Sequence, residues 1–248
     1  MAMIIYGINP VVEALRAGRV RRVRVGPRGD RRVEEALALA RSGGVAVERV
    51  DAPTLDRVAR GGIHQGIIAE LAPLENYSIA ELVAAAAPDA PLIVVLDGVE
   101  DPHNVGAIMR TADAAGVHGI VRQARHAASL EGVAAKASAG AFAHIRLATV
   151  VNIARAIEEI KDAGVWTVGL AAEAPEPYDA VDFTLPTALV LGAEGTGLRR
   201  LVRERCDRLV SIPMQGAVSS LNVSVAAGVT LFEIMRQRRN QDGTKKQP

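Results

Sequence analysis

The stretch from Leu92 to Thr111, LIVVLDGVEDPHNVGAIMRT, decides the fold of this chain. It opens with five apolar residues in a row, which is typical of a central parallel strand covered on both faces. A polar turn follows, and residues 104–115 have helical spacing, with Asn104 as a candidate N-cap. The carboxyl end of such a strand is where α/β folds gather ligands. Taken alone, however, the segment is explained more simply as a turn with a capping Asn104 and a solvated Arg110.

The same alternation of strands and helices continues toward the carboxyl terminus. Apolar runs indicate further strands at 117–121, 165–170, 187–191 and 208–212. Helical spacing occupies 153–163, 197–206 and 221–238. Strands that alternate with helices predict a mainly parallel sheet. The polar end, residues 240–248, is predicted to be disordered.

The first seventy residues predict a separate, smaller α/β domain. Strands are expected at 20–25, 45–50 and 66–71, and helices at 31–41 and 54–60. Residues 73–91 are bounded by prolines and contain one expected helix, 79–87, which indicates a linker. We therefore predict an amino-terminal domain over 1–72 and a larger carboxyl-terminal domain over 92–239.

Composition narrows the class of protein. Of the 248 residues, 49% are hydrophobic but only 3% aromatic, so the core must be built from aliphatic side chains. The sequence has no long uncharged apolar run, so we expect no membrane span. It also has no basic leader before an apolar run, so we expect no secretion signal. A single cysteine, Cys206, predicts a reduced, cytoplasmic protein. Five scattered histidines without ligand spacing predict no metal site.

Charge is distributed unevenly although the net charge is only +1. Residues 1–72 contain twelve arginines and no lysine against eight acidic residues. Eight of these arginines fall between Arg16 and Arg32, with Asp30 as the only acid among them. Guanidinium groups bond phosphate bidentately, so the cluster suits nucleic acid. An ordinary solvated face explains it equally well.

A glycine-rich loop follows the apolar run at 187–191. The sequence 189–198 reads LVLGAEGTGL, with three glycines in six residues, which allows close backbone approach to a ligand. The glycine order is neither that of a dinucleotide fold nor that of a P-loop. A carboxylate at Glu194 would be explained by an amine or hydroxyl partner, or simply by exposure on a tight turn.

A third polar segment, 211–228, reads SIPMQGAVSSLNVSVAAG. Ser219, Ser220 and Asn222 fall where a loop becomes a helix, so their side chains either cap the helix or bind a ligand. The sequence has no nucleophile elbow and no His/Asp pair of a serine hydrolase.

In this order and spacing, the three segments resemble motifs 1, 2 and 3 of the SpoU/TrmH methyltransferases. In addition, YGINPV from Tyr6 and HQGII from His64 resemble the amino-terminal domain of family members that methylate a guanosine ribose in large-subunit ribosomal RNA. The resemblance extends from Ile5 to about Arg239. It implies an S-adenosylmethionine-dependent RNA 2′-O-ribose methyltransferase with a deep trefoil knot in the carboxyl-terminal domain. It also implies a homodimer formed through that domain, and ribosomal RNA as substrate with transfer RNA as the alternative.

The resemblance also assigns roles to residues. Arg110 would act on the ribose hydroxyl, and because a guanidinium stays protonated in proteins we interpret it as an electrostatic stabiliser of the oxyanion. Asn104, Glu194, Ser220 and Asn222 would hold Arg110 and the ribose in place. The cofactor pocket would be formed by Leu191, Gly192, Ala193, Gly197, Ile212, Met214 and Leu221. RNA contacts are expected from Arg21, Arg22, Arg28 and His64.

Two questions stay open at the level of sequence. The last helix carries an apolar stripe, which is either a dimer face or intramolecular core: Leu221, Val225, Val229 and Phe232. The chain could also be a non-catalytic RNA-binding or ribosome assembly factor, although the residues of all three motifs are intact. A nicotinamide-dependent dehydrogenase is disfavoured by the glycine order.

Overall fold

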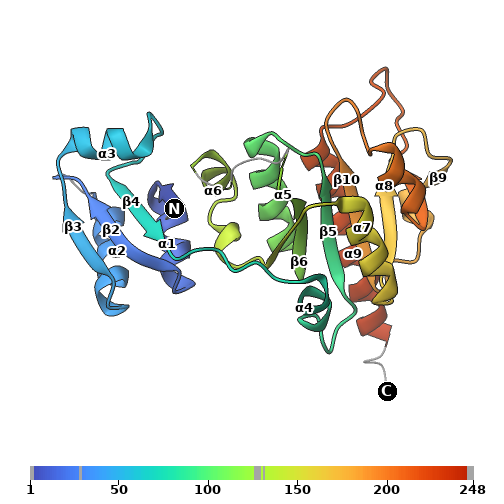
Figure 1. Ribbon diagram of the computed structural model, residues 1–248, viewed down its shortest axis with the longest axis horizontal. Coiled ribbons are helices and arrows are strands. Elements are labelled where there is room, and N and C mark those ends of the chain that lie inside the picture. Colours follow the sequence, from blue (N-terminus) through green and yellow to red (C-terminus); the bar gives the residue numbers. More distant parts are fainter. Residues whose placement is uncertain (1–2, 28–29, 126–129, 131, 245–248) are drawn as a thin grey trace. The chain divides into compact units, whose positions relative to one another are not determined.

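The computed structural model describes residues 3–27, 30–125, 130 and 132–244 (Figure 1), and the chain forms two compact units. The first unit contains residues up to Leu74 together with 102–110 and the described part of 128–144. The second contains 75–101, 111–127 and everything from Ile145 onward, within the described ranges.

The first unit is built on a mixed four-stranded sheet in the order β1-β4-β2-β3. Strand β4 is antiparallel to β1 and β2, whereas β2 and β3 are parallel. Residues up to Leu74 also form the helices α1, α2 and α3. Asp30 caps α2 by accepting a hydrogen bond from the Val33 backbone N–H at 3.0 Å. The bounds are β1 Met3–Tyr6, α1 Ile8–Arg16, β2 Val20–Val25, α2 Arg31–Ser42, β3 Ala46–Arg49, α3 Ala52–Ala59 and β4 Ile67–Leu71.

The second unit contains a seven-stranded sheet in the order β7-β6-β5-β10-β8-β11-β9. Every pairing in it is parallel, which confirms the predicted parallel architecture. The central strands β5 and β10 are buried at every position, as their unbroken apolar runs require. The bounds are β5 Leu92–Asp97, β6 Gly119–Gln123, β7 Leu147–Val150, β8 Trp166–Leu170, β9 Glu176–Pro177, β10 Thr187–Gly192 and β11 Arg208–Ser211.

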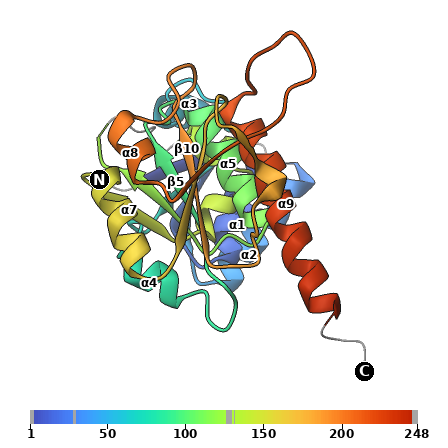
Figure 2. The same cartoon turned by 90° about the vertical axis from the view of Figure 1, so that its right-hand side faces the viewer.

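Helices cover both faces of this sheet. Figure 2 shows α7 (Ile153–Asp162) and α8 (Arg200–Arg205) on one side of β5 and β10, and α9 (Val223–Thr244) on the other. Helix α4 (Ile79–Ala84) begins with a capping box between Ser78 and Glu81. Its side chains Ile79 and Leu82 are buried in the same core as α7. The predicted linker segment thus contributes directly to the second unit.

Several expectations about element ends need correction. Helix α5 spans Pro102–Ala114, so it begins two residues before Asn104, which is buried inside the first turn and is not the N-cap. A proline suits the first helical position because its fixed φ matches the helix and it has no N–H to satisfy. Helix α9 continues to Thr244, so the part of the predicted disordered tail up to that residue is helical.

Some elements were not predicted at all. They are β1, α1, β7, the short helix α6 (Val133–Ala137) and the two-residue β9. Of the helices in the described ranges, none is both long and apolar enough to cross a membrane.

Candidate active site

A cavity of about 390 Å³ opens at the carboxyl ends of β8, β10 and β11, beside the first turn of α9. This volume falls within the roughly 300–1,000 Å³ that is usual for small-molecule sites. Four segments of the second unit supply most of its wall: 170–173, 191–198, 210–214 and 219–223. Ligands are expected at this edge of a parallel sheet, where successive loops meet.

The loop after β10 is a tight glycine hairpin, residues 192–197. Ala193 and Gly197 exchange two backbone hydrogen bonds, at 3.1 and 2.9 Å. A Cβ on Gly192 would lie 2.2 Å from the Gly197 carbonyl carbon, so no side chain fits there. Gly195 and Gly197 have φ values of +81° and +66°, which L-residues with side chains rarely adopt. Glycine is therefore required both by close approach and by conformation.

Asn222 joins this hairpin to α9. Its Oδ1 accepts hydrogen bonds from the Ser224 backbone N–H at 2.9 Å and from the Ser224 hydroxyl at 2.6 Å, which caps the helix. Its Nδ2 lies 3.4 Å from Oε1 of Glu194, to which it donates. One amide side chain thus connects two of the segments singled out from the sequence.

The structure brings most of the predicted site residues to one place. All seven residues expected to bind the cofactor line the cavity, and so do three of the residues assigned to catalysis. Their roles remain predictions, but their convergence does not depend on a family resemblance. The residues are Leu191, Gly192, Ala193, Gly197, Ile212, Met214 and Leu221 in the first group, and Glu194, Ser220 and Asn222 in the second.

Arg110 and Asn104 are not part of the cavity wall. Arg110 is exposed on α5. The next residue, Thr111, lies close to Gly228 of α9. Its Cγ2 is 3.8 Å from the position that a Cβ would take if residue 228 had a side chain. Asn104 is buried in the first turn of α5.

The arginine-rich strand has more carboxylate neighbours than the sequence indicated. Arg22 lies 3.6 Å from Glu48 of β3, while Arg24 lies 3.3 Å from Glu48 and 3.8 Å from Glu70 of β4. Between Arg16 and Arg32 the only acidic residue in the sequence is Asp30, but pairing of the strands brings Glu48 and Glu70 next to Arg22 and Arg24. Arg21 is exposed on the same strand, and Arg28 lies outside the described residues.

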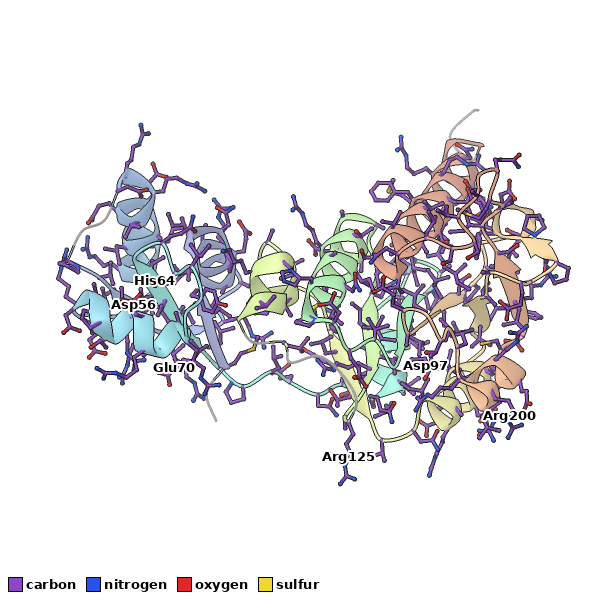
Figure 3. The ribbon with its side chains drawn as sticks, turned by 90° about the horizontal axis from the view of Figure 1, so that it is seen from above. Asp56, His64, Glu70, Asp97, Arg125 and Arg200 are labelled. Carbon is purple, nitrogen blue, oxygen red and sulfur yellow. The ribbon has the colours of Figure 1, made fainter. Side chains whose placement is uncertain are left out.

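His64 has a structural partner on each ring nitrogen. Its Nδ1 accepts a hydrogen bond from the Gly66 backbone N–H at 3.0 Å, and its Nε2 lies 3.1 Å from Asp56 (Figure 3). With Nδ1 as acceptor, Nε2 carries the proton and donates to the carboxylate. His64 therefore holds the turn before β4.

Sequence reasoning missed a buried carboxylate at the end of β5. The Asp97 side chain is 0% exposed, and it accepts hydrogen bonds from the backbone N–H of Arg199 at 2.8 Å and from its Nε at 2.6 Å. Nη2 of Arg199 donates to Gln123 at 2.8 Å. The only available signal was an acid placed directly after an apolar strand. Also missed were cavity residues 170–173 and the ion pair between Glu173 and Arg203.

Removing this carboxylate should destabilise the fold. We expect Asp97→Ala to lower the free energy of unfolding by about 2 kcal/mol, since the Arg199 backbone N–H loses its partner while the half-exposed guanidinium regains water. Urea unfolding measures the change. Glu204→Ala, which removes an exposed partner of Arg200, is the matched control and should cost less than about 0.5 kcal/mol. Equal stability of the two variants would contradict the structural role of Asp97.

Cys206, the single cysteine of the chain, is not part of the cavity wall. Burial, together with the charges of Asp207 and Asp97, raises the pKa of Cys206 to about 12, so its sulfur is no nucleophile at neutral pH. No His, Cys, Asp and Glu side chains gather as metal ligands in the described part of the chain.

The comparisons with known proteins agree with this geometry. Residues 91–232 match the SpoU rRNA Methylase family, and residues 4–77 match the RNA 2′-O ribose methyltransferase substrate binding family. The chain is 44% identical over 242 residues to the 23S rRNA (guanosine-2′-O-)-methyltransferase RlmB of Yersinia pestis, covering 96% of this chain and 98% of that one. It is 45% identical over 207 residues to the putative TrmH family tRNA/rRNA methyltransferase YacO of Bacillus subtilis, covering 83% of each.

A solved structure is similar over nearly the whole chain. The SpoU methyltransferase AviRb from Streptomyces viridochromogenes, crystallised in complex with the cofactor AdoMet, aligns with a TM-score of 0.80 at 28% identity, covering 96% of this chain and 91% of that one. Fold, cavity and matches together define an RNA 2′-O-ribose methyltransferase. The chain belongs to the SpoU family. SpoU methyltransferases bind S-adenosylmethionine, which confirms the expected cofactor.

Proposed function

We propose that this protein methylates the 2′-hydroxyl of a guanosine in 23S ribosomal RNA. Support comes from the 44% identity, over nearly the full length, to an enzyme named for that reaction. The match of residues 4–77 to a substrate-binding family adds to it. The cavity walled by the glycine hairpin carries the proposal, since it offers a site for the methyl donor. Transfer RNA is the second candidate, because the relative from Bacillus subtilis is named for both RNAs.

The domain arrangement is part of the proposal. Residues 1–72 would bind RNA, residues 73–91 would connect the two domains, and residues 92–239 would form the methyltransferase domain, with a deep trefoil knot around the segments that wall the cavity. The protein would work in the cytoplasm, where its RNA substrate is found.

A homodimer through the carboxyl-terminal domain is supported by the outer face of α9. Val225 is 50% exposed and Phe232 46% exposed, seven residues apart on one side of the helix. The core-facing side consists instead of Val223, Ala227, Leu231 and Ile234. The apolar stripe that the sequence left ambiguous is therefore not intramolecular core at these two positions.

The cavity fits S-adenosylmethionine in size and in the chemistry of its wall. Leu191, Ile212 and Leu221 offer apolar surface for the flat adenine, and backbone groups of the hairpin can hydrogen-bond its edge. The carboxylates of Glu173 and Glu194 suit hydroxyl and ammonium groups. When bound, the cofactor supplies a methyl group on a positively charged sulfur.

The remaining chemistry concerns the RNA. A ribose 2′-hydroxyl is a poor nucleophile that must lose a proton as it attacks, so the site needs alignment and stabilisation of negative charge on oxygen. The guanidinium of Arg110 would stabilise that charge, while an RNA phosphate or a water takes the proton. Glu194 and Asn222, already hydrogen-bonded to each other, would fix the hairpin and the start of α9 around the reacting atoms. Asn104 and Ser220 would help to hold the ribose.

Transfer of tritium from labelled S-adenosylmethionine tests the function. Purified protein would be incubated with a 23S rRNA transcript and, separately, with unmodified tRNA. We expect label in 23S rRNA, located in an alkali-resistant dinucleotide because a 2′-O-methyl group blocks cleavage at that position. Label in tRNA alone would replace the first candidate with the second. Absence of both label and cofactor binding would overturn the proposal.

Binding to RNA should depend steeply on salt. Aromatic residues make up only 3% of the chain, so stacking contributes little and phosphate contacts dominate. For about five phosphate contacts, the affinity for 23S rRNA should fall about a hundredfold between 50 and 200 mM salt. Filter binding at graded salt concentrations measures this. A change below about fivefold would mean that phosphates are not the main contacts.

A further inference from the structure

The buried carboxylate of Asp97 holds an arginine that the proposed mechanism does not use. Arg199 follows directly after Leu198, the last cavity-wall residue of the glycine loop. Its backbone N–H and its Nε both donate to Asp97, and its Nη2 contacts Asp97 and donates to Gln123 at the end of β6. These bonds involve both the main chain and the guanidinium. The side chain is thereby fixed in one orientation relative to the cavity wall.

This fixed guanidinium remains accessible. The Arg199 side chain is 50% exposed, although the carboxylate that holds it is fully buried. An ordinary surface ion pair has both partners in solvent and contributes little. Bonds to the main chain and guanidinium of Arg199 offset the cost of burying the Asp97 carboxylate, and the guanidinium that it orients keeps an exposed part that a ligand can bind.

Two further arginines lie close in sequence to the residue that holds Arg199. Gln123, which binds Arg199, is flanked in sequence by Arg122 and followed two residues later by Arg125. Figure 3 shows Arg125 extending away from the ribbon on the loop after β6, while Asp97 lies within the sheet. Arg122 is more enclosed, and burial lowers its pKa. Arg122 and Arg125 thus add positive charge next to Gln123, while Glu100 and Asp101 follow Asp97 on the neighbouring loop.

We propose that Arg199, oriented by Asp97 and Gln123, binds a backbone phosphate of the substrate RNA next to the cofactor cavity. The inference rests on the proposed function, because a 2′-oxygen that enters the cavity brings the phosphates of its own nucleotide with it. With Nε on Asp97 and Nη2 shared between Asp97 and Gln123, the guanidinium can offer the two hydrogens of Nη1 to phosphate oxygens. Arg199 would thus be a positioning residue that sets where the ribose enters.

Salt-dependent RNA binding distinguishes this role from a structural one. The probe is a 23S rRNA transcript, titrated in filter-binding assays into protein saturated with S-adenosylhomocysteine. Arg199→Gln should weaken binding about tenfold at low salt. It should also reduce the slope of log K against log salt by about 0.7, the loss of one phosphate contact on single-stranded RNA. Arg200→Gln is the matched control, since its guanidinium is paired with Glu204, and it should leave the slope unchanged.

A second variant keeps the test decisive if Arg199→Gln fails to fold or to bind S-adenosylhomocysteine. Arg199→Lys retains a charge for Asp97 but has no group in the place of Nη1, so RNA affinity should still fall about fivefold. A folded Arg199 variant with the affinity and slope of the Arg200 control would overturn the inference. If the unmodified protein itself does not bind the transcript, the 23S rRNA proposal fails instead.

Discussion

Arg110→Ala is expected to reduce kcat for RNA methylation about 10²–10³-fold while changing the affinity for S-adenosylmethionine less than threefold. The size of this decrease follows from the loss of one group that stabilises developing negative charge on oxygen. Such a loss typically raises the activation barrier by about 3–4 kcal/mol. The cofactor is spared because Arg110 is not part of the cavity wall. Single-turnover tritium transfer gives the rate, and calorimetric titration gives the affinity.

Matched variants make this result interpretable. Arg155→Ala removes another exposed arginine, paired with Glu159 on α7, and should leave the rate unchanged. Arg110→Lys retains the charge but not the planar fork, so an intermediate rate is expected. If Arg110→Ala turned over RNA at the normal rate, another group would have to stabilise the oxyanion.

Gly192→Ala should have a comparably large effect on a different quantity, the affinity for S-adenosylhomocysteine. The added Cβ would lie 2.2 Å from the Gly197 carbonyl carbon and 2.4 Å from the Leu198 backbone nitrogen. Both are main-chain atoms that cannot rotate away, so the hairpin must open and the cavity wall must move. We expect binding to weaken at least a hundredfold, measured by calorimetric titration.

The control for this variant lies elsewhere in the chain. Gly216 belongs to the loop between β11 and α9, and a Cβ there would meet nothing within 4 Å. Gly216→Ala should therefore bind S-adenosylhomocysteine within about twofold of the unmodified protein. Circular dichroism checks that Gly192→Ala is still folded. Tight binding by a folded Gly192→Ala protein would show that the hairpin does not form the cofactor site.

The sequence predicted those features that depend on neighbours along the chain. Strands β5 and β10 were recognisable because central parallel strands need apolar residues on both faces. The glycine hairpin was recognisable because three glycines in six residues, directly after a buried strand, favour a tight turn. Strands β1 and β7 have only four residues each, and α6 only five, so few positions could reveal them, although β3 and β11 are equally short and were predicted.

Features that depend on contacts between distant residues could not be predicted. The bond between Asp97 and Arg199 spans 102 positions, and no local pattern indicates it. The charge around Arg22 and Arg24 could be judged only after sheet pairing had brought Glu48 and Glu70 alongside. The burial of α9 was also undecidable, because its two apolar faces look alike until one is packed against β10.

The placement of α9 has a thermodynamic consequence. Its first turn belongs to the cavity wall and is capped by Asn222, while its outer face carries Val225 and Phe232. If two chains associate along that face, occupancy of the cavity and self-association become linked equilibria. Any factor by which the cofactor tightens the pair must equal the factor by which pairing tightens the cofactor.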